Sequence, residues 1–385
     1  MTTSKVALVR CEGYDPAEVV QAVARGLELL GGAAQFVQPG ERILLKPNLL
    51  VGARPEDLVS PHPTVFEALA ICLQAAGASL SYGDSPGFGK PEAAGRRAGL
   101  AEVAERLGIA QADFTRGREV DYPQGVLVKR FTIAEGALDT DGIVSVCKLK
   151  AHGLTRLTGA VKNQFGCVPG LLKGEFHARM ADLENFSQML VDLTAMLAPR
   201  LYVMDGIVAM EGNGPRSGDP RPMHVVLLSA DPVALDATVC RIVDVDPMLV
   251  GPVRVGEASG LGNAHDIEYV GDPVDSFVNP DFVVDRSAAS TAPAMVGGKL
   301  ASVVRSLVVP RPVIDHAKCT ACGTCVHVCP VTPKAVDFVP DSVPHTPPQH
   351  NYDLCIRCYC CQELCPERAI DVRVPLLGRL LHHKR

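Results

Sequence analysis

Cysteine is concentrated near the C-terminal end of the chain, where nine of the 14 copies lie between residues 319 and 365. Eight of the nine form two runs with one spacing, C-x2-C-x2-C-x3-C-P. In such a run three close thiolates bind one iron–sulfur cubane, and the fourth, which precedes proline, crosses to the other cubane. The repeated register therefore predicts two [4Fe-4S] clusters. The predicted ligands are Cys319, Cys322, Cys325 and Cys365 for the first cluster and Cys355, Cys358, Cys361 and Cys329 for the second.

The register also separates two adjacent thiols. Each cysteine of the first run recurs 36 positions later, which selects Cys361 as a ligand and leaves Cys360 as a bystander thiol. Zinc sites normally use two cysteine pairs, so the triplets argue against zinc. Residues 313–373 resemble the bacterial two-cluster ferredoxin family, a small α+β fold, except for a longer loop over residues 339–348. Two clusters in series form an electron conduit, because each carries one electron at a time.

A second group of charged residues lies between Val146 and Met180. This segment contains six Lys and Arg residues and one acidic residue, Glu175. The surplus of cations, together with glycines that let backbone N–H groups approach a ligand, predicts a pocket for phosphate, carboxylate or another small anion. A solvated basic loop is the alternative. Two further ligand candidates in this stretch, Thr158 and Asn163, are polar and uncharged. The candidates for binding here are Lys148, Lys150, Thr158, Lys162 and Asn163, and His152 is the candidate proton donor.

The elements that must position these residues alternate between short β-branched runs and longer helical stretches, which is typical of α/β folds with a parallel or mixed sheet and flanking helices. We expect strands at residues 6–9, 43–46, 79–82, 143–146, 201–204 and 225–228. Ligands bind beyond the carboxyl ends of such strands, which adds Lys46, Asn48 and Asp84 to the binding candidates. Asp15 and Asp231, each followed by proline, are expected to cap helices.

The amino-acid composition excludes some classes of function. The net charge is -6, hydrophobic residues make up 47% of the chain and tryptophan is absent. These values fit a globular protein and argue against nucleic-acid binding, which needs basic surface and aromatic stacking. Without an apolar stretch of 18 residues we expect no stable membrane insertion, and the cysteine cluster favours the cytoplasm.

The body also resembles a known family. Lys46-Pro47-Asn48, Gly83-Asp84-Ser85-Pro86, the segment from Lys148 to Asn163, and the segment from Asp205 to Asp236 are similar to the family of domain of unknown function 362. The resemblance covers about residues 5–285 and implies an iron–sulfur protein of redox role, with no substrate to carry over. We expect domains at residues 1–286 and 313–373, a linker at 287–312 and a basic tail at 374–385.

Three hypotheses follow. In the first, the clusters pass electrons to a small anionic ligand or organic cofactor in the α/β domain, as in an oxidoreductase. In the second, the protein is a non-catalytic relay or binding protein that docks a partner redox enzyme, which would act as electron donor or acceptor. In the third, the clusters only stabilise the fold of a non-redox enzyme.

Overall fold

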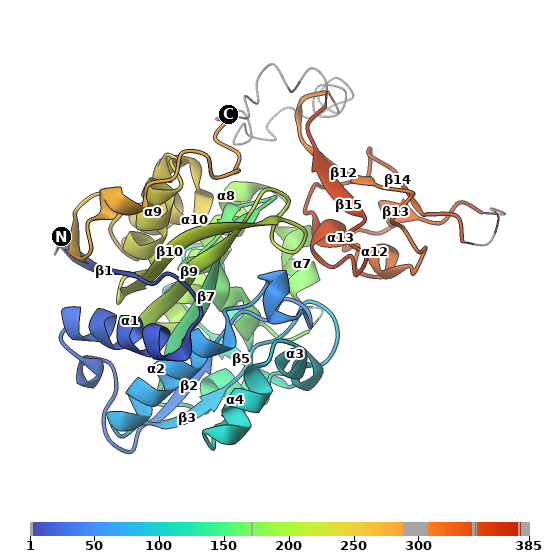
Figure 1. The fold of residues 1–385 in the computed structure, drawn as a ribbon. Coiled ribbons are helices and arrows are strands. Elements are labelled where there is room, and N and C mark those ends of the chain that lie inside the picture. The colour runs from blue at the N-terminus through green and yellow to red at the C-terminus, as the bar shows by residue number, and fades with distance from the viewer. Residues whose placement is uncertain are drawn as a thin grey trace.

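The structure is a computed structural model that describes residues 3–170, 172–287, 307–340, 343, 345–375 and 378. Most of the predicted linker and of the predicted basic tail lies outside the described residues. The α/β domain and a small C-terminal domain lie side by side, the latter drawn in red beside α7 (Figure 1).

The α/β domain is built on one nine-stranded sheet, with the order β11-β1-β10-β9-β7-β2-β3-β4 and with β8 paired to β7. Only β10 and β8 run against their neighbours within this sheet. All six predicted strands are confirmed, as is the mixed α/β fold. The strands are β1 (Ser4–Arg10), β2 (Arg42–Lys46), β3 (Ser79–Tyr82), β4 (Ala110–Gln111), β7 (Gly142–His152), β8 (Arg156–Thr158), β9 (Leu201–Glu211), β10 (Asp219–Ser229) and β11 (Ile267–Gly271).

Two predicted strand ends were wrong: β9 runs past Met204 to Glu211, and β7 also runs past its predicted end. Sequence polarity placed that end at Val146, but β7 continues to His152 and then turns back into β8. Lys148 and Lys150 are therefore inside the sheet, and both are buried. A strand can carry these lysines because each ammonium group finds an oxygen partner within the fold.

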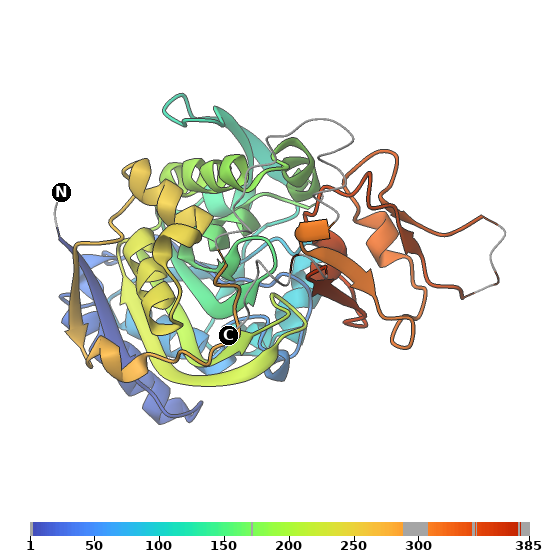
Figure 2. The same ribbon diagram turned by 90° about the horizontal axis from the view of Figure 1, so that it is seen from above.

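Helices cover both faces of the sheet because residues alternate between faces along each strand. One core joins Ala7 and Val9 of β1 to α1, α2 and α4, and the other joins Val6 and Leu8 to α8, α9 and α10. Figures 1 and 2 show these two helical layers. The helices are α1 (Pro16–Leu29), α2 (Pro63–Ala75), α3 (Pro91–Arg97), α4 (Leu100–Arg106), α5 (Glu135–Leu138), α6 (Ala160–Asn163), α7 (Leu172–Arg179), α8 (Leu183–Leu197), α9 (Pro232–Ile242) and α10 (Gly251–Ala258).

The predicted caps are also confirmed. The Asp15 side chain accepts hydrogen bonds from the first turn of α1, and Asp231 does the same for α9. A separate antiparallel hairpin, β5 (Gly117–Asp121) and β6 (Arg130–Ala134), lies outside the main sheet. No helix among the described residues is long and apolar enough to cross a membrane.

The C-terminal domain has short elements only. β12 (Arg311–Ile314) pairs with β15 (Ile370–Arg373), and β13 (Val336–Asp337) pairs with β14 (Gln349–His350). The helices α12 (Thr324–His327) and α13 (Cys360–Glu363) each contain one turn. β12 begins at Arg311, just inside the predicted linker.

Candidate functional site between the two domains

The two predicted sets of cysteine ligands are each brought together. Cys319, Cys322, Cys325 and Cys365 line one small cavity of the C-terminal domain. Burial, and then charge on Cys365, Cys319 and Cys322, raise the pKa of the Cys325 thiol to about 12 in the absence of iron. For Cys361 the neighbouring thiols that raise the pKa, after burial, are Cys358, Cys355, Cys325 and Cys329. Because Cys325 of the first set is also near Cys361, the assignment of each thiol to one cluster stays a prediction.

The surroundings of the cysteines suit iron–sulfur clusters. Backbone N–H groups donate to three of the sulfurs: Ala321 to Cys319, Ala335 to Cys329 and Ala369 to Cys365, each at 3.4 Å. Such bonds to sulfur stabilise the thiolate charge and set cluster potentials. Thiols gathered in one small domain, three of them with backbone N–H donors, fit the donor set that [4Fe-4S] clusters require.

A cavity of about 310 Å³ lies where the C-terminal domain meets the carboxyl ends of the sheet strands. Six of the sequence-predicted binding residues line it, together with Cys329, a predicted ligand of the second cluster. Cys360, the thiol that the register excludes from ligation, also lines the cavity. The six predicted residues are Asn48, Asp84, Lys150, Thr158, Lys162 and Asn163.

The cavity is rich in cations. Lys150 is 2% exposed, and its Nζ donates a hydrogen bond to Val59 O at 2.7 Å. Burial is the largest cause that lowers the pKa of Lys150 to about 7, and charge on Lys162 lowers it further. Burial likewise lowers the pKa of Lys173, on α7, to about 7. Three carboxylates, Asp84, Glu175 and Glu363, line the same cavity, so it holds charged groups of both signs.

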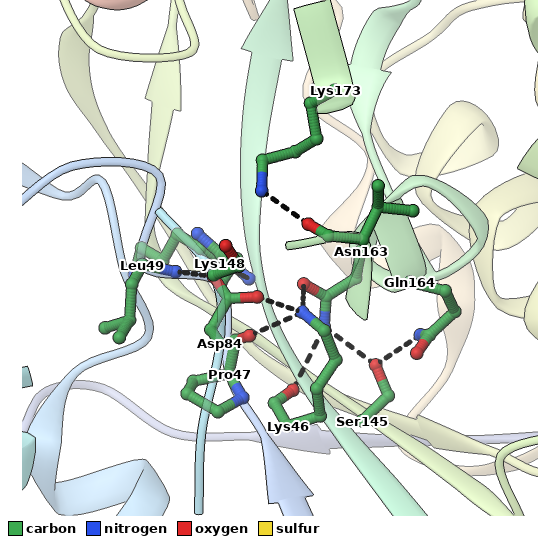
Figure 3. A network of polar contacts seen from close by, with 12 residues as sticks. Lys46, Pro47, Leu49, Asp84, Ser145, Lys148, Asn163, Gln164 and Lys173 are labelled. Carbon is green, nitrogen blue, oxygen red and sulfur yellow. Dashed lines mark hydrogen bonds and ion pairs between the residues drawn. The ribbon is translucent and has the colours of Figure 1, made fainter. Parts of the chain in front are cut away.

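Lys46 has a different role. Its Nζ, fully buried, lies 2.6 Å from Asp84 Oδ1 and donates to Pro47 O at 2.8 Å (Figure 3). Asp84 Oδ2 accepts from the Leu49 N–H at 2.6 Å. A Cβ at Gly166 would lie 1.8 Å from Asp84 Oδ1, so only glycine fits beside this carboxylate. The pair joins the ends of β2 and β3 below the cavity, and Lys46 itself does not line the cavity.

Lys148 is separated from Lys150 by an irregularity in the pairing of β7 with β9. Its Nζ lies 2.8 Å from Asp205 Oδ2 and 2.8 Å from the Tyr14 hydroxyl. The Tyr14 ring stacks on His62, with ring centroids 3.9 Å apart. Burial lowers the pKa of Lys148, against the attraction of Asp205. Lys148 therefore belongs to a separate buried cluster and does not line the cavity.

His152, the predicted proton donor, is buried at the domain interface, outside the cavity lining. Its Nδ1 accepts from the N–H groups of Leu154, at 3.0 Å, and Thr155, at 3.4 Å. The neutral ring therefore carries its proton on Nε2, which lies 3.1 Å from Glu363 Oε1. Burial, and then charge on Lys162, lower the pKa of His152 to about 4. Proton donation by His152 stays a prediction, and it requires the contact with Glu363 to open.

Several contacts join the domains. Gln362 Nε2 donates to Asn213 O at 2.9 Å, and Asn213 Nδ2 donates to Asp371 Oδ1 at 3.2 Å. Arg368 forms an ion pair with Asp57. One apolar cluster combines Val328 and Leu364 of the C-terminal domain with residues of the α/β domain: Val51, Ala53, Leu58, Val59 and Met210.

Several polar cavity residues were not among the site candidates, including Lys173, His177, Ser85 and Glu363. Lys173 and His177 lie within the basic segment between Val146 and Met180, so the excess of basic residues there could have identified them. Burial lowers the pKa of His177 to about 4. Ser85 and Glu363 carried no such signal, because Ser85 reads as a turn residue and Glu363 lies between two cluster ligands. Attraction to His152 and Lys162 outweighs burial and holds the pKa of the Glu363 carboxyl well below its usual range.

Two family models match different parts of the chain. A family model described as domain of unknown function (DUF362) matches residues 43–241, and one described as a 4Fe-4S dicluster domain matches residues 311–369. The chain is 37% identical over 257 residues to the thylakoid-associated protein sll1697 of Synechocystis sp., covering 66% of this chain and 79% of that protein.

Two solved structures share 11% identity with the chain. The lactate racemase apoprotein from Thermoanaerobacterium thermosaccharolyticum has a TM-score of 0.40, covering 63% of this chain and 57% of that one. A protein from Thermotoga maritima has a TM-score of 0.34, covering 69% of this chain and 63% of that one. The chain thus spans less than two thirds of either structure.

Proposed function

This chain belongs to the DUF362 family, and we propose that it is an iron–sulfur oxidoreductase that passes electrons through two [4Fe-4S] clusters to a small anionic ligand or cofactor between its domains. One observation carries the proposal. The cavity that Lys150 and Lys162 line from the α/β domain is also lined by Cys329, a predicted ligand of the second cluster. A ligand held by the cations would therefore lie next to a cluster.

The clusters would supply electrons one at a time. The chain's own residues would bind and orient the ligand: Lys150 and Lys162 by charge, and Thr158 and Asn163 by neutral hydrogen-bonding groups. The domain contact would exclude bulk water, which strengthens each of these interactions. Leu364 and Phe165 add apolar walls, so an anion with an apolar body suits the cavity.

Electrons would enter at the first cluster. Its ligand Cys322 is exposed, whereas Cys329 of the second cluster is buried against the cavity. The partner in this proposal is an electron-donor protein that docks near Cys322. A reducing compartment such as the cytoplasm suits a protein whose cysteines are all free thiols.

The test is to purify the full chain without oxygen, measure iron and sulfide, and then identify the small molecules released on denaturation by mass spectrometry and absorbance. We expect about eight irons per chain and one stoichiometric anionic compound. Lys162→Ala should lose most of that compound, and Lys90→Ala, a change at an exposed lysine outside the cavity, should retain it.

Two outcomes would contradict the proposal. Loaded clusters that change redox state, with no small molecule released, would favour an electron relay to a partner enzyme. Clusters that stay in one redox state over accessible potentials would favour a purely structural role.

A further inference from the structure

Lys150 is the buried cavity lysine with hydrogen-bonding capacity to spare. Its Nζ makes one hydrogen bond within the described residues, to Val59 O, so two of the three ammonium donors have no partner there. Thr158, 7% exposed, lines the same cavity, and its hydroxyl also lacks a hydrogen-bond partner in the described part of the chain. Two polar groups with unused hydrogen-bonding capacity thus line one cavity.

Three other candidates for proton donation lie outside the cavity. Lys46 and Lys148 each lie within 2.8 Å of a buried carboxylate, and neither lines the cavity. His152 lies outside the cavity lining: its Nδ1 accepts from the Leu154 N–H, and its Nε2 lies 3.1 Å from Glu363 Oε1. Lys150, in contrast, shares the cavity with Cys329.

We propose that Lys150 is the catalytic proton donor, the group that supplies a proton to the ligand as electrons arrive from the second cluster. This inference rests on the proposed function. The ligand class is a small anion with a polarised double bond, C=C or C=O, that accepts two electrons and two protons.

The step balances as follows. Each reduced cluster gives up one electron and is oxidised, and the π bond of the ligand is reduced to a single bond. One N–H bond of the Lys150 ammonium breaks as a bond from hydrogen to the ligand forms, and the second proton comes from water. A low-potential one-electron donor protein then reduces the clusters, and water returns a proton to the amine.

The charges around Lys150 make its protonation sensitive to cluster reduction. The cations near it are Lys148, Lys162, Lys173 and Lys334, the carboxylates are Asp84, Glu175 and Glu363, and the imidazoles are His177 and His327. Burial holds the pKa of Lys150 at about 7 in the absence of clusters. Each electron adds one negative charge nearby, which favours the ammonium form. Reduction should therefore draw a proton onto Lys150.

The experiment is an EPR-monitored redox titration of the anaerobic full chain, with dithionite as reductant and no added ligand, from about pH 6 to about pH 9. In the wild type, one midpoint potential should be flat below the Lys150 pKa and then fall with pH. The slope cannot exceed about 59 mV per tenfold change in proton concentration, the limit for one electron and one proton.

Three variants sharpen the test. In Lys150→Met the midpoint potential should be independent of pH and lower than that of the wild type at low pH. The two potentials should become equal at high pH, where the wild-type amine is neutral. In Lys150→Arg the midpoint potential should be independent of pH and as high as that of the wild type at low pH, because the guanidinium stays charged. Lys162→Met removes a neighbouring positive charge, which lowers the pKa of Lys150 in the wild type. This variant should keep the pH dependence of the midpoint potential, but the fall should begin at a higher pH. Iron content and circular dichroism confirm that each variant is folded and loaded.

A wild-type potential that is independent of pH, or a slope that persists in both Lys150 variants, would overturn the inference. Clusters that do not load or do not titrate would instead overturn the proposed function. The two failures are therefore distinguishable.

Discussion

The two domains of this protein are stabilised in different ways. The α/β domain has an extended apolar core on each face of its sheet. The C-terminal domain has a core of eight buried residues, and four of them are cysteines, Cys325, Cys329, Cys361 and Cys365. Its helices are single turns, which are not stable alone. Apolar burial therefore stabilises the α/β domain, whereas the C-terminal domain depends on what its cysteines bind.

The largest effect should come from removing iron. Chelation should abolish amide protection in β12 and β15 and leave β7 and β9 protected, because metal binding contributes about 10 kcal/mol to the folding of small metal-dependent domains. Hydrogen exchange with mass spectrometry would measure this. Cys360→Ala, a change at the excluded thiol, should retain iron and protection. Equal amide protection of β12 with and without iron would show that the C-terminal domain does not depend on iron for its stability.

Within the α/β domain, the buried pair should matter most. Lys46→Met leaves Asp84 buried without its cation and should cost about 3–5 kcal/mol of unfolding free energy. The matched change, Arg42→Met, breaks a pair with Asp141 in which the Arg42 side chain is 62% exposed, and should cost about 0–1 kcal/mol. Urea denaturation would measure both. Similar losses would show that burial does not set the value of these pairs.

Acid should weaken the α/β domain through His177. The unfolded pKa of histidine is about 6.5, and the folded value is about 4, so the unfolded state binds more protons between these values. Stability is therefore complete above about pH 6.5 and falls as the pH drops toward 4. His177→Phe, which keeps the stack on Phe186, should remove up to about 3 kcal/mol of this loss. Urea titrations at several pH values would measure it. Unchanged pH dependence in the variant would assign the loss to other groups.

The smallest effect should come from one of the contacts that join the domains. Gln362→Ala removes donors to the Asn213 backbone and side chain and should weaken docking by about 1–2 kcal/mol. Small-angle scattering and the distance between dyes on the two domains would report docking. Gln349→Ala, an exposed change on β14, is the matched control. A larger effect of the control would place the docking surface elsewhere.

Much of the fold could be predicted because its signals are local. β-branched runs marked the six strands, and an aspartate before proline marked α1 and α9. The error at Val146 has a physical cause. Charge ends a strand in most sequences because a buried ammonium is costly, but here Val59 O and Asp205 compensate Lys150 and Lys148. Those partners are far away in the sequence.

Local patterns were enough to predict the α/β alternation and the helix caps, because each depends on a few neighbouring residues. The cluster ligands stay a prediction from the same kind of pattern. Only the tertiary structure decided the roles of the lysines. Lys46, Lys148 and Lys150 look alike in the sequence, yet the fold gives the first two a buried carboxylate and the third a cavity. It also places Glu363 against His152. Contacts between distant segments set burial and charge, and no local pattern encodes them.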